Sequence, residues 1–434
     1  MQQEQKDQYH HYIPRFLLRN FAINYYERIF VNNKNLFKQR GHKRNFRDKN
    51  KEEALLQTYD RTKSQFDVSL VAKTYGIENM YKDFNHEDVM RVESKLAKLE
   101  GQVARVIHDI VRTSQKESQI VLLNTDLNDL CKFLFIMDYR KPYRWSQFKN
   151  ENFDSRTWPF MKQFMQEYKL KSTLEVWLQN IHEILITDHK DIKDSLRIFM
   201  PDREDYVNRM MDRFLVIWQA GENDEFVTTN NGFGTFEGIN EILDEPFPQF
   251  KFNYAFHYFY VISPKLVLVL CSVFLREEII SPFKCQTIFE NVPRPPVPKC
   301  VRLNNKNNHR TDGNVTLIER LINAQGFKTE TSDKYTFPFV KVTSATVHLV
   351  NAVILNESKP DEIMSFLSHS CLYKSIVKYH KNKDIKILKQ DYSSLKKNLF
   401  VALNRTHKEN LNLRRSIPAD RICDWEVRDL SPEP

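Results

Sequence analysis

Glycine is scarce in this chain of 434 residues, which contains only nine, against about 7% of residues in an average protein. Phosphate-binding loops of nucleotide enzymes need several glycines close together, and neither a Walker loop nor a GxGxxG motif occurs. The GxSxG turn that carries the nucleophile of many serine hydrolases is also absent. Any chemistry must therefore come from side chains on helices and short strands.

Paired cysteine motifs and long uninterrupted apolar runs are missing too. The six cysteines are scattered without a CxxC pair, which is typical of reduced, structural thiols. The N-terminus has no apolar signal-peptide region. The most apolar stretch, residues 256–275, is interrupted by Ser263, Pro264 and Lys265, which favours two buried strands joined by a turn over a membrane span. The sequence thus predicts an intracellular protein, cytoplasmic or nuclear, that is not secreted and has no membrane contact.

Aromatic residues and positive charge are what the sequence does contain. Aromatics make up 12% of the chain, enough to exclude a mainly disordered protein. The net charge of +9 is unevenly placed: residues 1–50 carry eleven basic and four acidic residues, residues 201–250 three and eleven, and residues 301–434 twenty-two and fifteen. Basic ends of this kind bind phosphate backbones, so nucleic acid is one expected partner. Alternatively, the basic ends could pack against the acidic middle of the chain, or their charges could lie on a solvated surface.

The hydrophobic periodicity predicts helices and a few short strands. Helices are expected at residues 89–110, 125–139, 172–184, 205–220, 344–355 and 360–379. Strands are expected at residues 55–59 and 226–229 and on both sides of Pro264. This pattern indicates an α+β fold that is mainly helical, with short antiparallel strands in the N-terminal part and around residues 225–275.

The same pattern suggests one large module with two appendages. Residues 1–8 form a polar tail, residues 9–379 the module, and residues 380–434 a basic C-terminal extension. Proline and asparagine are concentrated at residues 284–312, which predicts a loop inside the module.

Two glutamates on the predicted helix 89–110 are candidates for chemistry. Glu93 and Glu100 are seven residues apart beside the apolar stripe. They face the same way at about 10 Å along the helix axis, too far apart to share a proton but able to point into one cleft.

The segment His10–Phe21, with the sequence HHYIPRFLLRNF, is the most unusual in the chain. It combines two histidines and two arginines with aromatic residues. Histidine can act as a general base or metal ligand, and arginine can clamp a phosphate or carboxylate. The alternative is a buried anchor whose histidine donates to a backbone carbonyl.

This segment resembles the opening motif HYxPxFxLRxF of the family called domain of unknown function 4238. Further matches follow in the same order: the pair Tyr59–Asp60, the "E, six residues, E-G" helix at Glu93–Gly101, an R-x-P-x-R helix end at Arg140–Arg144, and the SP turn at Ser263–Pro264. The family's T-S-D-N-P turn is replaced here by residues 228–232, where Asn230 takes the place of the carboxylate.

The resemblance implies one polar site gathered from distant parts of the chain. The candidate catalytic residues are His11, Asp60, Glu93 and Glu100, and the candidate substrate-binding residues are Arg15, Arg19, Arg140, Arg144 and Asn230. Imidazole, carboxylates and arginines are what phosphodiester hydrolysis needs, including ligands for a divalent ion such as Mg²⁺ or Mn²⁺.

Three functions remain open at this point. The first is a metal-assisted phosphodiesterase or nuclease-like enzyme built on that set. The second is a non-catalytic module that binds nucleic acid through the basic termini. The third is a protein-interaction module in which the polar set is a buried ion network. If the carboxylate of the family's turn binds a metal or moves a proton, Asn230 marks impaired activity. If that carboxylate only caps the turn, an asparagine can cap it equally well.

Overall fold

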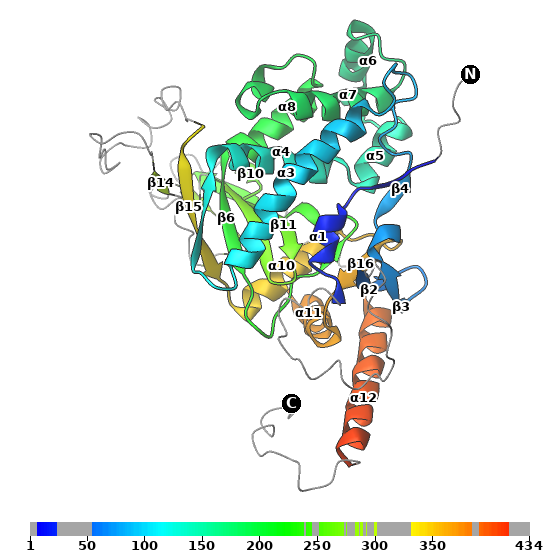
Figure 1. Cartoon of the computed structure of the whole chain (residues 1–434), viewed down its shortest axis with the longest axis vertical. Helices are drawn as coiled ribbons and strands as arrows, with labels where there is room; N and C mark the ends of the chain where they lie inside the picture. Colours follow the sequence, from blue (N-terminus) through cyan, green and yellow to red (C-terminus); the bar gives the residue numbers. More distant parts are fainter. Residues whose placement is uncertain are drawn as a thin grey trace, which may run out of the picture.

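The computed structural model describes residues 7–23, 54–237, 240–244, 251–272, 331–383 and 390–415, together with short stretches between residues 275 and 301. Residues 24–53, which hold most of the basic residues of the N-terminal part, lie outside the described residues, as do the C-terminal residues 416–434 and most of the expected loop 284–312. The chain is an α+β protein in which helices and strands both hold large parts of the fold (Figure 1).

A seven-stranded sheet forms the centre of the molecule. Its order is β14-β15-β6-β12-β11-β8, and β5 pairs with β15 outside that path. These strands are β5 (Gln119–Leu123), β6 (Arg213–Gln219), β8 (Phe233–Phe236), β11 (His257–Ser263), β12 (Leu266–Ser272), β14 (Lys299–Val301) and β15 (Lys334–Lys341). β15 runs parallel to β6, whereas the other pairs are antiparallel.

The expected strand pair around Pro264 is confirmed as the hairpin β11–β12. Every residue of both strands is buried, which explains why each is an almost continuous apolar run. Among the described residues, no helix is both long and apolar enough to cross a bilayer.

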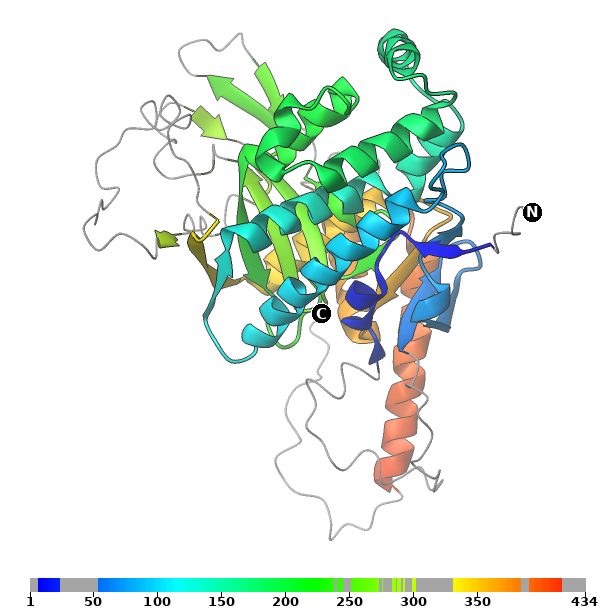
Figure 2. The same cartoon turned by 45° about the horizontal axis from the view of Figure 1, so that its top comes forward.

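Helices cover the sheet and extend from it. They are α1 (Arg15–Arg19), α3 (Arg91–Thr113), α4 (Asn124–Tyr139), α5 (Pro142–Lys149), α6 (Thr157–Glu167), α7 (Thr173–Ile186), α8 (Met200–Tyr206), α10 (Ser344–Glu357), α11 (His369–Lys381) and α12 (Ser393–Arg415). Figure 2 shows α3 and α4 crossing one face of the sheet, with α10 visible behind the strands. α12 runs away from the rest of the described fold (Figure 1).

Four predicted helices appear close to where the periodicity placed them, and α4 matches the window 125–139 to within one residue. α3 buries the predicted apolar stripe, including Leu96, Leu99 and Val103. In α7 the Ser172 side chain accepts a hydrogen bond from the Glu175 backbone N–H at 3.2 Å, as its capping sequence predicts. α10 begins at Ser344, as expected.

Two predicted helices are wrong in part. The window 205–220 holds only the end of α8, a π turn (Val207–Met211) and then β6. The run Phe214–Trp218 is apolar at every position because β6 is buried on both faces, and periodicity alone cannot separate such a strand from a buried helix. The window 360–379 contains β16 (Ile363–Phe366) before α11 begins.

Smaller sheets join distant parts of the chain. A four-stranded sheet has the order β3-β2-β16-β7, and two- and three-stranded sheets have the orders β1-β4 and β10-β9-β13. Their strands are β1 (Tyr9–His11), β2 (Leu55–Asp60), β3 (Gln65–Leu70), β4 (Gly76–Glu78), β7 (Thr228–Thr229), β9 (Asn240–Asp244), β10 (Lys251–Tyr254) and β13 (Phe283–Cys285). The β1–β4 pair places the N-terminal segment beside α3.

Candidate functional site

A polar pocket of about 400 Å³ lies between the β1–α1 segment and α3. Its polar lining comes mainly from His10, His11, Arg15, Tyr81, Glu93 and Glu100. The volume falls within the range of roughly 300–1,000 Å³ that is common for small-molecule sites. Four of the nine residues predicted from the sequence therefore line one pocket.

Gly76 allows the N-terminal strand to approach β4 closely. A Cβ atom at this position would lie 2.5 Å from the Tyr9 ring and 2.7 Å from the His10 carbonyl oxygen. The contact with the His10 backbone cannot be relieved by a side-chain rotation. The glycine thus fixes the wall of the pocket that His10 and His11 form.

The change Gly76→Ala should lower the free energy of unfolding by about 1–3 kcal/mol, because the added methyl group forces β1 away from β4. Urea denaturation measures this loss. Gly101→Ala is the control: it lies on α3 at the same pocket, its Cβ would meet nothing within 4 Å, and alanine favours the helix. Equal stability of the two variants would contradict the close approach.

His11 is held as a neutral side chain with both ring nitrogens engaged. Nδ1 lies 3.0 Å from the Thr74 carbonyl oxygen and therefore donates to it, and Nε2 accepts from Arg15 Nε at 3.0 Å. Burial first, and the Arg15 charge second, lower the pKa of His11 from 6.5 to about 4. His11 is thus a positioning residue for Arg15, whose side chain is exposed at the pocket, and it is not a free general base.

His10, which the sequence did not single out for chemistry, is more deeply buried than His11. Its Nδ1 accepts from the Tyr81 backbone N–H at 3.0 Å, and its ring stacks on Tyr81 with centroids 5.2 Å apart. Burial chiefly, together with the Lys82 charge, lowers the pKa of His10 to about 4. The neutral ring therefore carries its proton on Nε2, a buried atom with no hydrogen-bond partner in the structure. His10 thus lines the pocket, but its Nε2–H is sealed from it.

Glu100 is paired with an arginine that has no contact with solvent. Arg140, at the end of α4, is 0% exposed, and its Nη1 lies 2.7 Å from Glu100 Oε1. Its Nη2 lies 2.8 Å from the Met137 sulfur. The α3–α4 packing thus places the cation directly behind the pocket, where it holds Glu100 in one orientation.

Glu93 is the carboxyl group best placed for proton transfer. Burial raises the pKa of Glu93 above its usual 4.5, the negative charge of Glu100 raises it further, and Arg140 opposes both effects. Like Glu100 it is half-buried and lines the pocket. A carboxylate whose pKa is raised by burial is a stronger base than an exposed glutamate.

The donor set does not fit a divalent metal. Within the described ranges, no group of three or more His, Cys, Asp or Glu side chains is arranged to hold an ion. In this pocket Glu100 bonds to Arg140 and both His11 nitrogens are engaged, so only Glu93 remains as a carboxylate ligand. We therefore derive no step through Mg²⁺ or Mn²⁺.

Three of the predicted residues bond elsewhere in the structure. Asp60 ends β2 and pairs with Lys63, at 3.1 Å between Oδ2 and Nζ. Arg144 pairs with the buried carboxylate of Asp202. Asn230 Oδ1 accepts from the Ile363 backbone N–H at 3.3 Å, a bond that an aspartate would form equally well.

Arg19 is also outside the pocket. It lies exposed in the last turn of α1, and it is not among the residues that line the cavity. The polar set implied by the resemblance is therefore divided: one part surrounds the pocket and the other stabilises separate parts of the fold.

A buried polar cluster beside β16 was missed entirely. Glu362 Oε1 accepts from the Asn231 side-chain amide, while Glu362 Oε2 and Asn231 Oδ1 have no partners. The nearby hydroxyls of Thr228 and Thr229 are likewise buried without a partner. Burial raises the pKa of Glu362 from 4.5 to about 7. Nothing in the local sequence around Glu362 distinguishes it from a surface glutamate.

The fold and the pocket define an α+β protein with a Glu/His/Arg cavity between its N-terminal segment and α3. Residues 9–365 match the family described as Protein of unknown function (DUF4238), so the chain belongs to that family. The match includes both walls of the pocket and all but the last residue of β16. No curated protein and no solved structure matches the chain.

Proposed function

We propose that the pocket hydrolyses phosphodiesters through its own side chains, with Glu93 as the proton-transfer group. The observation that carries the proposal is a half-buried carboxyl group with a raised pKa in the same pocket as an exposed arginine. Arginine is suited to bind a phosphate, and a carboxylate with a raised pKa is suited to accept a proton. The proposal keeps the hydrolase predicted from the sequence but not its metal.

The proposed reaction needs one proton acceptor and one cationic side chain that binds the anion. The Glu93 carboxylate takes a proton from the attacking water as the water oxygen bonds to phosphorus. The bond from phosphorus to the leaving oxygen breaks, and that oxygen takes the proton from Glu93. Arg15, which is exposed at the pocket, supplies positive charge and hydrogen bonds to the phosphoryl oxygens.

The change Glu93→Gln should reduce the rate of cleavage by about 10²–10⁴-fold, because glutamine cannot accept the proton. The measurement uses labelled RNA, labelled single-stranded DNA and bis(p-nitrophenyl) phosphate, each with EDTA and with added Mg²⁺ or Mn²⁺. In the wild type the rate should rise with pH through a pKa above 4.5, since Glu93 must be ionised.

Glu117→Gln is the matched control for Glu93→Gln, since Glu117 is exposed just after α3 and outside the pocket. Full activity of Glu93→Gln, or no cleavage of any substrate by the wild type, would sink the proposal. Cleavage that EDTA abolishes would restore the metal-assisted form and overturn the metal-free one.

A second candidate is the interaction module whose polar cluster is structural. It is favoured by the complete burial of Arg140 and by the two satisfied nitrogens of His11. In that case neither the wild type nor Glu93→Gln should cleave any substrate, and Glu93→Gln should have a higher melting temperature because a half-buried charge is removed. The cleavage activity therefore separates the two functions, because the change in melting temperature is expected from both.

A further inference from the structure

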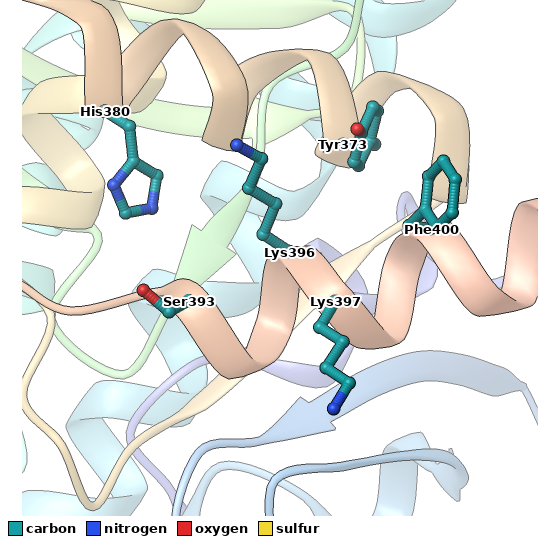
Figure 3. A pocket seen from close by; sticks show the side chains of 6 residues that line it. All are labelled: Tyr373, His380, Ser393, Lys396, Lys397 and Phe400. Carbon is teal, nitrogen blue, oxygen red and sulfur yellow. The ribbon is translucent and has the colours of Figure 1, made fainter.

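A second cavity, remote in sequence from the first, lies between α11 and α12. It has a volume of about 370 Å³ and is lined by Tyr373, His380, Ser393, Lys396, Lys397 and Phe400. Figure 3 shows Tyr373 and Phe400 close together at one end of the cavity, with the Lys396 chain directed toward α11. We refer to this cavity as the α11–α12 groove.

The two helices that form the groove are basic. Over α11 and over α12 as far as residue 405 there is no aspartate or glutamate. The lysines and arginine of these segments are all exposed: Lys374, Lys378, Lys381, Lys396, Lys397 and Arg405. A concentration of exposed positive charge on adjacent helices attracts polyanions and raises their rate of association.

Aromatic side chains lie among these charges. Phe400 is 55% exposed, and its ring centroid lies 6.5 Å from that of Tyr373. The inner side of α12 is already packed through the buried residues Leu395 and Leu399, and Tyr392 is buried just before the helix begins. Phe400 is therefore not needed to seat the helix, and its ring is available for a ligand.

Single-stranded nucleic acid fits this combination better than an acidic protein segment does. Its phosphates suit exposed lysines, and its unpaired bases stack on aromatic rings. An acidic peptide would use the lysines but would gain nothing specific from Phe400. We propose that the α11–α12 groove binds single-stranded nucleic acid, with phosphates on the lysines and a base on Phe400.

The inference names the substrate class for the proposed hydrolase, and binding at the groove does not itself require hydrolysis. Groove-dependent binding without any cleavage would overturn the proposed hydrolysis alone. Cleavage without groove-dependent binding would overturn the groove alone. Binding is therefore measured on Glu93→Gln, which keeps the oligonucleotide intact.

The test is fluorescence anisotropy of the full chain with labelled oligouridine and oligothymidine across a range of salt concentrations. In the Lys396→Ala/Lys397→Ala variant, affinity at low salt should fall at least 10-fold. The slope of log affinity against log salt should flatten by about 1.4, at about 0.7 for each lost phosphate contact. Phe400→Ala should weaken binding about 5-fold or more and leave the slope unchanged, because stacking releases no counterions.

The control is Lys190→Ala/Lys193→Ala, which removes the same charge from exposed lysines on another part of the surface. The proposal is supported if either oligonucleotide binds and the lysine and Phe400 variants change its affinity and salt dependence as stated. An equal loss in the control variant, no effect of Phe400→Ala, or binding of polyglutamate as tight as that of the oligonucleotides would overturn it. Circular dichroism and thermal melting verify that each variant is folded.

Discussion

Replacing Arg140 by methionine should lower the free energy of unfolding by about 3–5 kcal/mol, the range expected when one partner of a buried ion pair is removed. Arg140 is fully buried, and its Nη1 bonds to Glu100 at 2.7 Å. Without it, Glu100 loses its cation, and the repulsion between Glu100 and Glu93 is no longer opposed. Chemical denaturation of the purified variant measures the loss.

Two further variants separate the ion pair from the general effect of losing an arginine. Arg112→Met removes an exposed arginine of α3 that pairs with Asp109 at 3.1 Å, and it should cost less than about 1 kcal/mol. Adding Glu100→Gln to Arg140→Met should recover part of the lost stability, because the uncompensated carboxylate is removed. If Arg140→Met is as stable as Arg112→Met, the ion pair does not hold α3 to α4.

The variant Glu362→Gln should make the protein more stable than the wild type at pH 8 by up to about 3 kcal/mol, since a tenfold change in proton affinity corresponds to about 1.4 kcal/mol. In the folded state, burial raises the pKa of Glu362 from 4.5 to about 7. An acid whose pKa is raised on folding destabilises the protein as pH increases between its unfolded and folded values. The loss of stability caused by the ionised Glu362 is therefore absent below pH 4.5 and complete above pH 7.

Melting temperatures at pH 5, 6, 7 and 8 test the expectation for Glu362. The difference between Glu362→Gln and the wild type should grow with pH and level off above pH 7. Glutamine can still accept from Asn231 through its oxygen, and its amide can donate to nearby unsatisfied oxygens. Glu117→Gln, an exposed glutamate, should show a constant difference. A constant difference for Glu362→Gln as well would refute the raised pKa.

Local sequence patterns predicted the helices and strands in which the spacing of apolar residues matches the burial of those residues in the structure. α3 has one apolar face and one polar face, so its periodicity fixed both its extent and the shared direction of Glu93 and Glu100. The hairpin β11–β12 was recognisable because Ser263 and Pro264 interrupt an apolar run. β6 was not, because a strand covered on both faces has no alternation to detect.

The sequence could predict which residues of the candidate site lie close together only where those residues share one helix or one short motif. The pairing of Arg140 with Glu100 depends on how α4 packs on α3, which no local pattern specifies. Arg144 belongs to the same R-x-P-x-R sequence but bonds to Asp202 instead. Membership of a family motif therefore identified important polar residues. It could not separate the residues that stabilise the fold from those that line the pocket.

The pairing of β2 with β16 also bears on how the chain is made. Asp60 lies opposite Ile363 in this ladder, and the Asn20 side chain bonds to the Ile262 carbonyl oxygen at 2.8 Å. During translation at about 5–20 residues per second, roughly 15–60 s pass between synthesis of the two strands. β2 must wait that long on the ribosome without β16, so this ladder of high contact order is completed late in folding. The pocket differs, because the residues that line it lie between Gln8 and Ala104 and are all synthesised early.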